Sequence, residues 1–154
     1  MDTDLHWTCQ PFNQLRVDQL YAILALRDQV FVLEQQSLYG DIDGLDIDSH
    51  HVCAWHPTAG LVAYARLLPP KVKYPDCAAI GRVVIAPAWR NLGLGKKLFA
   101  YALTETVLLW PRQDIMLAAQ HDKCGLYAQF GFVAQGELFD DGGVLHQTML
   151  RKSV

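Results

Sequence analysis

The chain has 154 residues, of which 51% are hydrophobic and 19% are charged, and its formal net charge is −3. This length fits one domain that buries enough surface to fold without disulfide bonds or a structural metal. The acidic balance argues against nonspecific binding to nucleic acid or to a membrane surface, which needs positive potential. We therefore expect a single domain over residues 1–154, with neither nucleic acid nor membrane as a partner.

The N-terminus lacks the basic start and apolar stretch of a signal peptide. No apolar run approaches the ~20 residues of a transmembrane helix. None of the four cysteines, at positions 9, 53, 77 and 124, has the Cys-x-x-Cys spacing of a zinc or redox site. These features favour a cytoplasmic protein with reduced thiols and no bound metal.

The first half of the chain alternates clear periodic patterns with turn residues. Apolar residues at helical spacing predict a long amphipathic helix, and short apolar runs predict strands. The predicted elements are an edge-type strand over 7–12, a helix over 17–34, an Asp-rich loop over 35–49, and a hairpin of strands 51–55 and 61–67.

The second half begins with a proline-rich connection at 69–75, which predicts an exposed segment. The elements predicted after it are a buried strand over 79–85, a helix over 94–108, a strand over 115–119, a short helix over 124–130, and strands over 133–139 and 144–150 around an Asp-Asp-Gly-Gly turn. This order, without repeats or a linker, indicates one α+β domain around a mixed sheet.

The segment 82–98 carries the clearest chemical signal. A β-branched strand ends there, and the turn 90–95, Arg-Asn-Leu-Gly-Leu-Gly, opens a helix. Gly93 and Gly95 let backbone N–H groups approach a ligand closely, and a helix N-terminus favours an anion. With the nearby charge of Lys96, the pattern predicts a pyrophosphate site. The alternative is a tight strand-to-helix turn flanked by basic residues.

The Arg-x-x-Gly-x-Gly turn after Val-Val-Ile-Ala-Pro at 83–87 resembles motif A of the GCN5-related N-acetyltransferase (GNAT) superfamily. Residues 117–120 followed by 126–132 resemble its motif B. A narrower resemblance, to the ElaA-like subfamily, lies in the segments 26–36, 41–44, 63–67 and 80–83 and in His146 after the Asp-Gly turn. The element order matches this fold over essentially the whole chain.

The resemblance implies a GNAT fold: a mixed, mostly antiparallel twisted sheet of about seven strands flanked by helices and splayed between the fourth and fifth strands. It also implies binding of acetyl-CoA, with the pantetheine amides pairing to an open strand edge. The implied cofactor-binding residues are Val83, Val84, Ile85, Arg90, Asn91, Leu92, Gly93, Leu94, Gly95, Lys96, Gln120 and Tyr127.

Tyr127 is the expected acid, because a phenol within a hydrogen bond of the thioester sulfur can protonate the departing thiolate. An amine acceptor also needs a base, since alkylamines are cationic at neutral pH. Glu34 at the end of the first helix, His51 and His146 are the candidates, and a water relay is an alternative. Taken alone, Tyr127 would be interpreted as a core aromatic, Glu34 as a solvated carboxylate at a helix end, and each strand histidine as structural.

The loop 41–48 alternates Asp with other residues but fails the calcium-loop pattern, because Asp46 stands where that loop needs glycine. We interpret it either as a solvated acidic loop or as an anionic rim that attracts a cationic acceptor. Asp43 and Asp46, together with His146, are therefore the expected substrate-binding residues.

The function expected from these features is acetyl-CoA-dependent N-acetylation of a primary amine on a small molecule or a peptide. Two alternatives stay open: a non-catalytic acyl-CoA sensor, and an enzyme like the acyl-homoserine-lactone synthases, which the pattern Arg27-x-x-Val30-Phe31 beside an acidic loop also resembles. The acceptor is not identified. Sheet edges and aromatic residues such as Trp55 and Trp89 are compatible with a homodimer.

Overall fold

The computed structural model describes residues 4–154 and joins seven strands in one sheet, in the order β1-β2-β3-β4-β5-β7-β6. The strands are β1 (His6–Pro11), β2 (His50–His56), β3 (Gly60–Leu68), β4 (Cys77–Ile85), β5 (Asp114–Gln120), β6 (Val133–Asp141) and β7 (Val144–Arg151). The α-helices are α1 (Val17–Arg27), α2 (Leu94–Leu109) and α3 (Cys124–Ala128). This confirms the predicted α+β class, and only β4 and β5 pair in parallel.

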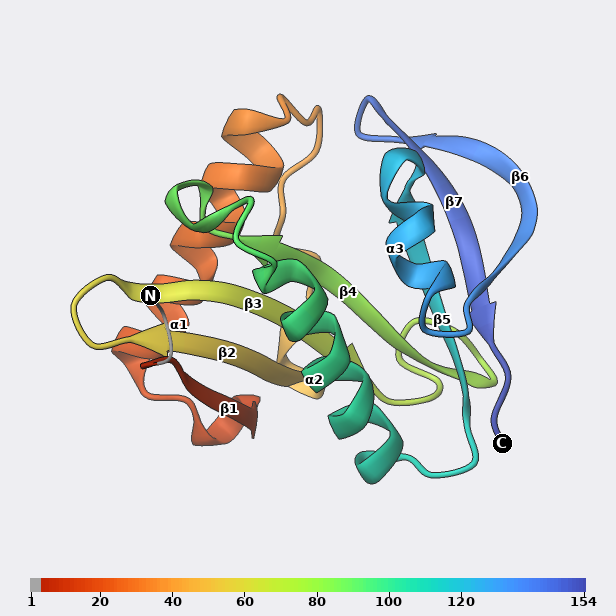
Figure 1. Cartoon of the computed structure of the whole chain (residues 1–154), viewed down its shortest axis with the longest axis horizontal. Coiled ribbons are helices and arrows are strands. Elements are labelled where there is room, and N and C mark those ends of the chain that lie inside the picture. The colour runs from red at the N-terminus through yellow and green to blue at the C-terminus, as the bar shows by residue number, and fades with distance from the viewer. Residues whose placement is uncertain (1–3) are drawn as a thin grey trace.

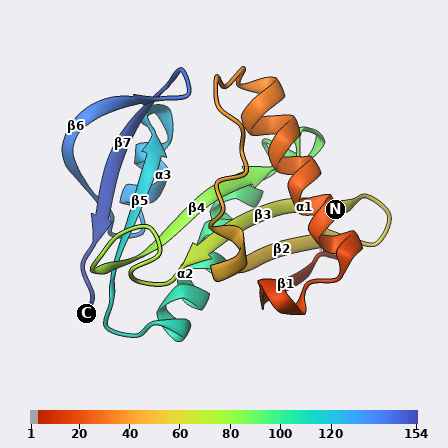
Figure 2. The ribbon, with the colours of Figure 1, turned by 180° about the vertical axis from the view of Figure 1, so that it is seen from behind.

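The helices cover the two faces of the sheet (Figures 1 and 2). Helices α2 and α3 lie on one face and α1 lies on the other. Because side chains alternate along a strand, β3 serves both layers: Tyr64 packs in the α1 core with Ile23, whereas Ala63 and Ala65 pack in the α2 core with Phe99. No helix among residues 4–154 is long and apolar enough to cross a membrane.

The long first helix changes its winding before it ends. After Arg27 it continues as a π-helical segment, η2 (Asp28–Glu34), in which the Gln35 N–H donates to the Val30 carbonyl at 3.1 Å. Such segments are frequent at functional sites. The Asp-rich loop also contains a short 3₁₀ turn, η3 (Asp46–Asp48), and α3 ends two residues earlier than predicted.

The sheet splays between β4 and β5, as predicted. These strands pair only over Cys77–Ala79 and Asp114–Met116. Beyond that point β4 bulges, and Arg82 takes a left-handed φ of 51°. Residues 80–85 therefore present an edge that is unpaired on the β5 side. Figure 1 shows the two halves of the sheet joined at the start of β4 and diverging toward its end.

Trp55 and Trp89, the aromatic residues considered for a homodimer, are both partly buried. Trp55 is half-buried against the α1 core and its Nε1–H donates to Thr8 Oγ1 at 3.3 Å. The Trp89 ring lies 5.0 Å from the His56 ring. Each indole is therefore packed within its own chain and remains partly exposed.

Candidate active site

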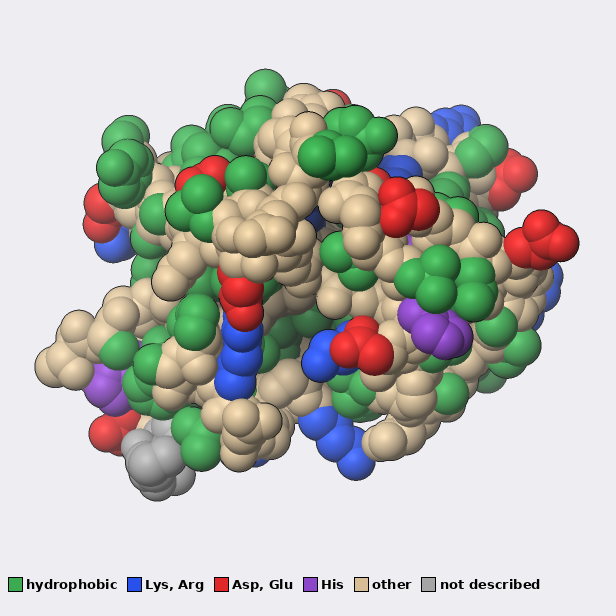
Figure 3. Space-filling model, turned by 90° about the horizontal axis from the view of Figure 1, so that it is seen from above, with side chains coloured by type: hydrophobic (Ala, Val, Ile, Leu, Met, Phe, Trp, Pro, Cys, Tyr) green, Lys and Arg blue, Asp and Glu red, His purple; other side chains and the backbone are tan. Residues whose placement is uncertain are grey.

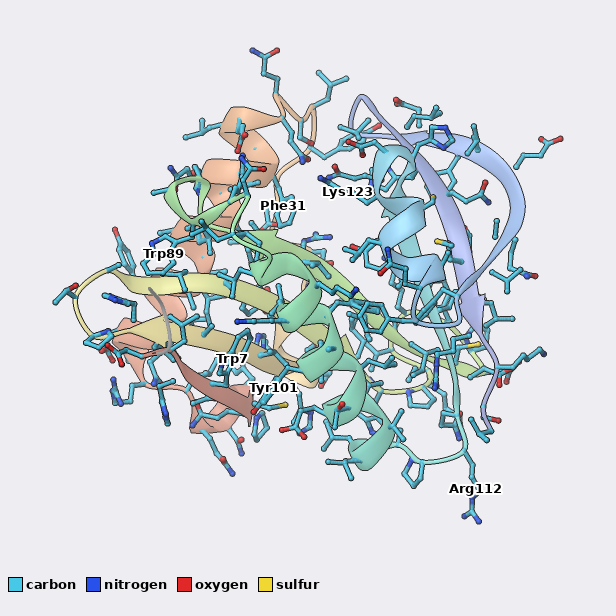
Figure 4. All side chains as sticks on the ribbon, in the orientation of Figure 1. Trp7, Phe31, Trp89, Tyr101, Arg112 and Lys123 are labelled. Carbon is cyan, nitrogen blue, oxygen red and sulfur yellow. The ribbon has the colours of Figure 1, made fainter. Side chains whose placement is uncertain are left out.

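A cavity of about 490 Å³ lies in the splay between the two halves. Figure 3, which views the molecule of Figure 1 from above, shows a hollow with acidic and basic side chains around it. In Figure 4 Phe31 of η2 and Lys123, just before α3, reach toward the gap from opposite halves, and both line the cavity. This volume is within the usual range for small-molecule and cofactor sites.

The predicted site residues divide into two groups. Those that line the cavity are Glu34, Val83, Val84, Ile85, Arg90, Gly95, Gln120, Tyr127 and His146. Those that do not are Asp43, Asp46, His51, Asn91, Leu92, Gly93, Leu94 and Lys96. In the second group, the Leu94 side chain is buried in the α2 core, whereas Asn91, Leu92 and Lys96 are exposed around the turn.

The turn before α2 exposes main-chain donors. Asn91 and Gly93 take left-handed φ values of 65° and 77°, and Gly93 is the N-cap of α2. The N–H groups of residues 91–95 donate to no backbone carbonyl outside the helix within the described chain, and the first turn offers them none. Free donors at a helix N-terminus form an anion site, and the open β4 edge ends beside it.

Arg90 connects this turn to the end of η2. Its guanidinium donates to both carboxylate oxygens of Glu34, at 2.6 and 2.7 Å, and its Nε donates to the Ile85 carbonyl at 3.3 Å. The hydrogen bond from Arg90 lowers the pKa of Glu34. Glu34 thus pairs with a cation, and this pairing makes its carboxylate a weak base.

Tyr127 lies on α3 at the wall of the cavity. Its ring packs edge-on against Phe99 at 4.8 Å, which fixes α3 to α2. Burial raises the pKa of Tyr127 to about 12, with smaller contributions from Cys124 and Asp122. No hydrogen bond occupies its hydroxyl among residues 4–154, and the hydroxyl is not sealed from the cavity. The side chain is therefore a protonated phenol available to a ligand.

His51 does not reach the cavity, which contradicts its expected catalytic role. The residue is fully buried beneath α1. Its Nε2–H donates to the Asp46 carbonyl at 2.9 Å, and its Nδ1 accepts from the Tyr64 hydroxyl at 2.6 Å. Burial lowers the pKa of His51, so the ring is neutral and its two nitrogens are already in use. Its role is to hold the acidic loop on the sheet.

His146 is better placed to accept a proton. It lies on β7 at the cavity, stacked on Phe139 with the ring centres 5.8 Å apart. Its Nδ1–H donates to the Val144 carbonyl at 2.8 Å. In the neutral ring this assignment leaves the Nε2 lone pair unprotonated, and the described residues supply no donor to it.

The Asp-rich loop is an ion-pair network rather than an anionic rim. Asp46 accepts from Arg27 at 2.7 Å and from Arg66 at 2.9 Å, and Asp43 accepts from Arg66 at 2.8 Å. Asp41 accepts from Arg27 and from Arg82, both at 2.7 Å. Three carboxylates thus balance three guanidinium groups. This corrects the expectation that Asp43 and Asp46 offer free negative charge to a substrate.

The arginines of this network are not predicted as partners of the loop from the sequence. Arg27 and Arg66 are buried, with 0% and 1% of each residue exposed. The available signal was an arginine inside each of two apolar runs, since arginine is almost never fully buried unless it is paired. The pattern Arg27-x-x-Val30-Phe31 therefore has a structural explanation, because Arg27 anchors the loop.

The sequence profile of the acetyltransferase (GNAT) domain matches residues 18–153. The chain therefore belongs to the GNAT family of acetyltransferases. Within that family it is ElaA-like: Escherichia coli ElaA is 36% identical over 152 residues, which cover 97% of this chain and 98% of ElaA. The crystal structure of ElaA gives a TM-score of 0.89.

Two further solved structures place this fold. An acyl-CoA N-acyltransferase from Pseudomonas aeruginosa is 41% identical with a TM-score of 0.90, covering 96% of this chain and 99% of that chain. The spermidine N-acetyltransferase of Vibrio cholerae, in complex with CoA and spermine, shares the fold with a TM-score of 0.70 at 17% identity, over 98% of this chain and 96% of that one.

Proposed function

We propose that this protein transfers an acetyl group from acetyl-CoA to a primary amine by direct attack on the thioester. The observation that carries the proposal is the combination within one splay of an open β4 edge, a donor-rich turn at its end and the free phenol of Tyr127. Family membership and the CoA-bound neighbour of similar fold support it.

In this proposal the main chain binds the co-substrate. The β4 edge at 83–85 pairs with the pantetheine amides, as an added strand pairs with a sheet edge. The N–H groups of residues 91–95 hold the pyrophosphate, assisted by Arg90. Gln120, on the facing strand β5, lies on the cavity wall on the side of α3.

The side chains supply the proton transfers. His146 Nε2 accepts a proton from the acceptor ammonium, directly or through water, which frees the amine lone pair for attack on the thioester carbonyl. The C–N bond forms and the C–S bond breaks, and the Tyr127 hydroxyl donates its proton to the departing thiolate. The proton that the nitrogen loses as the amide forms passes through water to the Tyr127 phenolate and restores the phenol. Because the pKa of Tyr127 is raised to about 12, the phenol carries that proton at neutral pH.

The first test is a thermal-shift titration with acetyl-CoA, CoA and an unrelated polyanion. A ligand at 100 times its dissociation constant adds about 2.7 kcal/mol of stability, which is on the order of 5–10 °C for this size. We expect shifts with the first two ligands only, followed by thiol release with an amine panel. Binding without thiol release for any amine would favour an acyl-CoA sensor. No shift at millimolar ligand would contradict both functions.

A further inference from the structure

The cavity has a basic region away from the turn before α2. Lys73, in the connection that leads into β4, lines the cavity together with Arg66 of β3 and Arg82 of β4. The turn 90–95 follows the other end of β4. The basic region and the proposed pyrophosphate site are therefore distinct, and the basic region belongs to the part of the cavity left for the acceptor.

The carboxylates around these cations are already engaged. Asp41 lines the cavity, but one of its oxygens accepts from Arg27 and the other from Arg82. Asp43 and Asp46 pair with these arginines and do not line the cavity. The three aspartates therefore neutralise the three arginines, and this part of the wall offers a polyamine no free carboxylate from the 41–46 loop. Asp122 and Asp141 also line the cavity, beside α3 and at the end of β6.

Lys73 adds a positive charge to this balanced network. It makes no ion pair with a carboxylate in the part of the chain that the structure describes, residues 4–154. Lys73 is exposed at the cavity wall, where partial loss of solvent lowers its pKa, and Arg82 and Arg66 lower it further against the opposing effects of Asp43 and Asp141. A bound anion would relieve this repulsion, since a nearby opposite charge favours the ammonium form.

Arg82 offers a second donor to the same space. Its Nε and Nη2 bind Asp41 and Asp43, while its Nη1 has no acceptor among the described residues and is not buried. The backbone φ of 51° at Arg82 is unfavourable for a residue with a side chain. A bulge of this kind redirects a side chain, and strain of this kind concentrates at ligand sites.

We propose that the acceptor is an amino carboxylate, whose carboxylate group binds Lys73 Nζ and Arg82 Nη1 while its amine faces the thioester. This inference rests on the proposed transferase function and names its substrate class. A single negative charge matches Lys73, the one cation of this basic region that pairs with no carboxylate among the described residues. A di- or polyamine would instead place a cation against Lys73 and the two arginines.

The test compares acceptors that differ only at the end remote from the amine. Glycine, β-alanine, 4-aminobutyrate and 6-aminohexanoate are each assayed beside their carboxamides and the diamines of equal length, by thiol release at saturating acetyl-CoA. At the best length we expect kcat/KM for the carboxylate to exceed that for the amide on the order of 10-fold, the usual scale for one charge-assisted hydrogen bond. The diamine should be poorer still.

The variant Lys73→Met keeps the apolar stem and removes the charge. It should bring the carboxylate-to-amide ratio close to one, chiefly through KM for the carboxylate. Lys71→Met is the matched control, because Lys71 lies in the same connection and is exposed like Lys73 but does not line the cavity. It should leave the ratio unchanged. Calorimetric titration of the same compounds in the presence of CoA measures their binding without turnover.

Each outcome separates the two proposals. If amides or diamines react as well as carboxylates, or if Lys73→Met keeps the ratio, the carboxylate site is wrong and the transferase function stands. If no compound reacts but amino carboxylates bind in a Lys73-dependent manner, the transferase function fails and the carboxylate site stands. If none of them reacts or binds, the carboxylate site is wrong.

Discussion

The two ends of the cavity differ in the groups that form them: main-chain groups at one end and charged side chains at the other. The turn at 91–95 and the β4 edge at 83–85 present main-chain groups from one short stretch of sequence. The other end is a network of side chains from α1, the 41–46 loop, β3 and β4. A main-chain site depends on backbone shape, which glycine permits, whereas a buried charge network depends on every member. Substitutions should therefore affect the two ends differently.

The largest effect should come from the network. Asp46→Asn keeps the shape of the side chain but leaves Arg27 and Arg66 short of a buried counter-charge. Removing one partner of a buried ion pair costs about 3–5 kcal/mol, and we expect the unfolding free energy in urea to fall by that order. Asp18→Asn removes an exposed carboxylate that pairs with Arg16 and should have no measurable effect. Equal stabilities for the two variants would contradict a structural network.

Acid should weaken the same network. Burial acts to raise the pKa of Asp46 and Asp43, but the hydrogen bonds and charges of Arg27, Arg66 and Arg82 outweigh it and hold both pKa values below the usual range. Groups with a lowered folded-state pKa contribute stability above the unfolded pKa of about 3.9, and this stability is lost as pH falls below it. Urea unfolding from pH 7 to pH 3 should show this loss, and Asp46→Asn should reduce its slope.

The difference between the ends also explains what the sequence could predict. The Arg-x-x-Gly-x-Gly turn, the β4 strand and Tyr127 lie in contiguous motifs, so their placement at one cavity follows from local pattern and element order. The pairing of Asp46 with Arg27 and Arg66 joins residues 19 and 20 positions apart. No local pattern encodes such contacts, so the sequence shows an Asp-rich loop but not the arginines that pair with Asp41, Asp43 and Asp46.

The burial of His51 was missed for a related reason. The sequence pattern around a histidine at the start of a strand does not show whether its side chain faces the cavity or is buried between the sheet and a helix. The face of the sheet that the His51 side chain occupies depends on the register between β2 and β3, in which His51 lies opposite Arg66. The π-helical end of the first helix was equally hidden, since the apolar spacing continues through it.

The next largest effect is expected for kcat when the proposed acid, Tyr127, is changed. Tyr127→Phe keeps the ring that packs on Phe99 and removes the hydroxyl, and kcat should fall about 100-fold, at the lower end of general acid catalysis. Tyr101→Phe on α2 is the matched control, because its ring packs on Trp7 away from the cavity. A kcat within twofold of the wild-type value would exclude Tyr127 as the acid.

Replacing Gly95 by alanine should raise the stability of the protein and lower its affinity for CoA. A Cβ at Gly95, in the first turn of α2, meets no protein atom within 4 Å, so Gly95→Ala should stabilise the helix by roughly 0.5–1 kcal/mol. The same methyl group would lie against the proposed pyrophosphate and weaken CoA binding. Gly125→Ala in α3 also meets nothing within 4 Å but lies off the cavity, so it should leave CoA affinity unchanged. Unchanged affinity in Gly95→Ala would locate the pyrophosphate elsewhere.

The smallest expected effect is a change in CoA affinity when the ion pair between Glu34 and Arg90 is broken. It also tests which residue acts as the base. The pyrophosphate must compete with the Glu34 carboxylate for Arg90 and is repelled by it. Glu34→Gln should therefore tighten CoA binding severalfold, and because both side chains are partly exposed, added salt should reduce the gain. Glu137→Gln, on the exposed strand β6, controls for net charge. Weaker CoA binding would mean that Glu34 orients Arg90 for the phosphate, whereas a fall in kcat at unchanged CoA affinity would restore Glu34 as the base in place of His146.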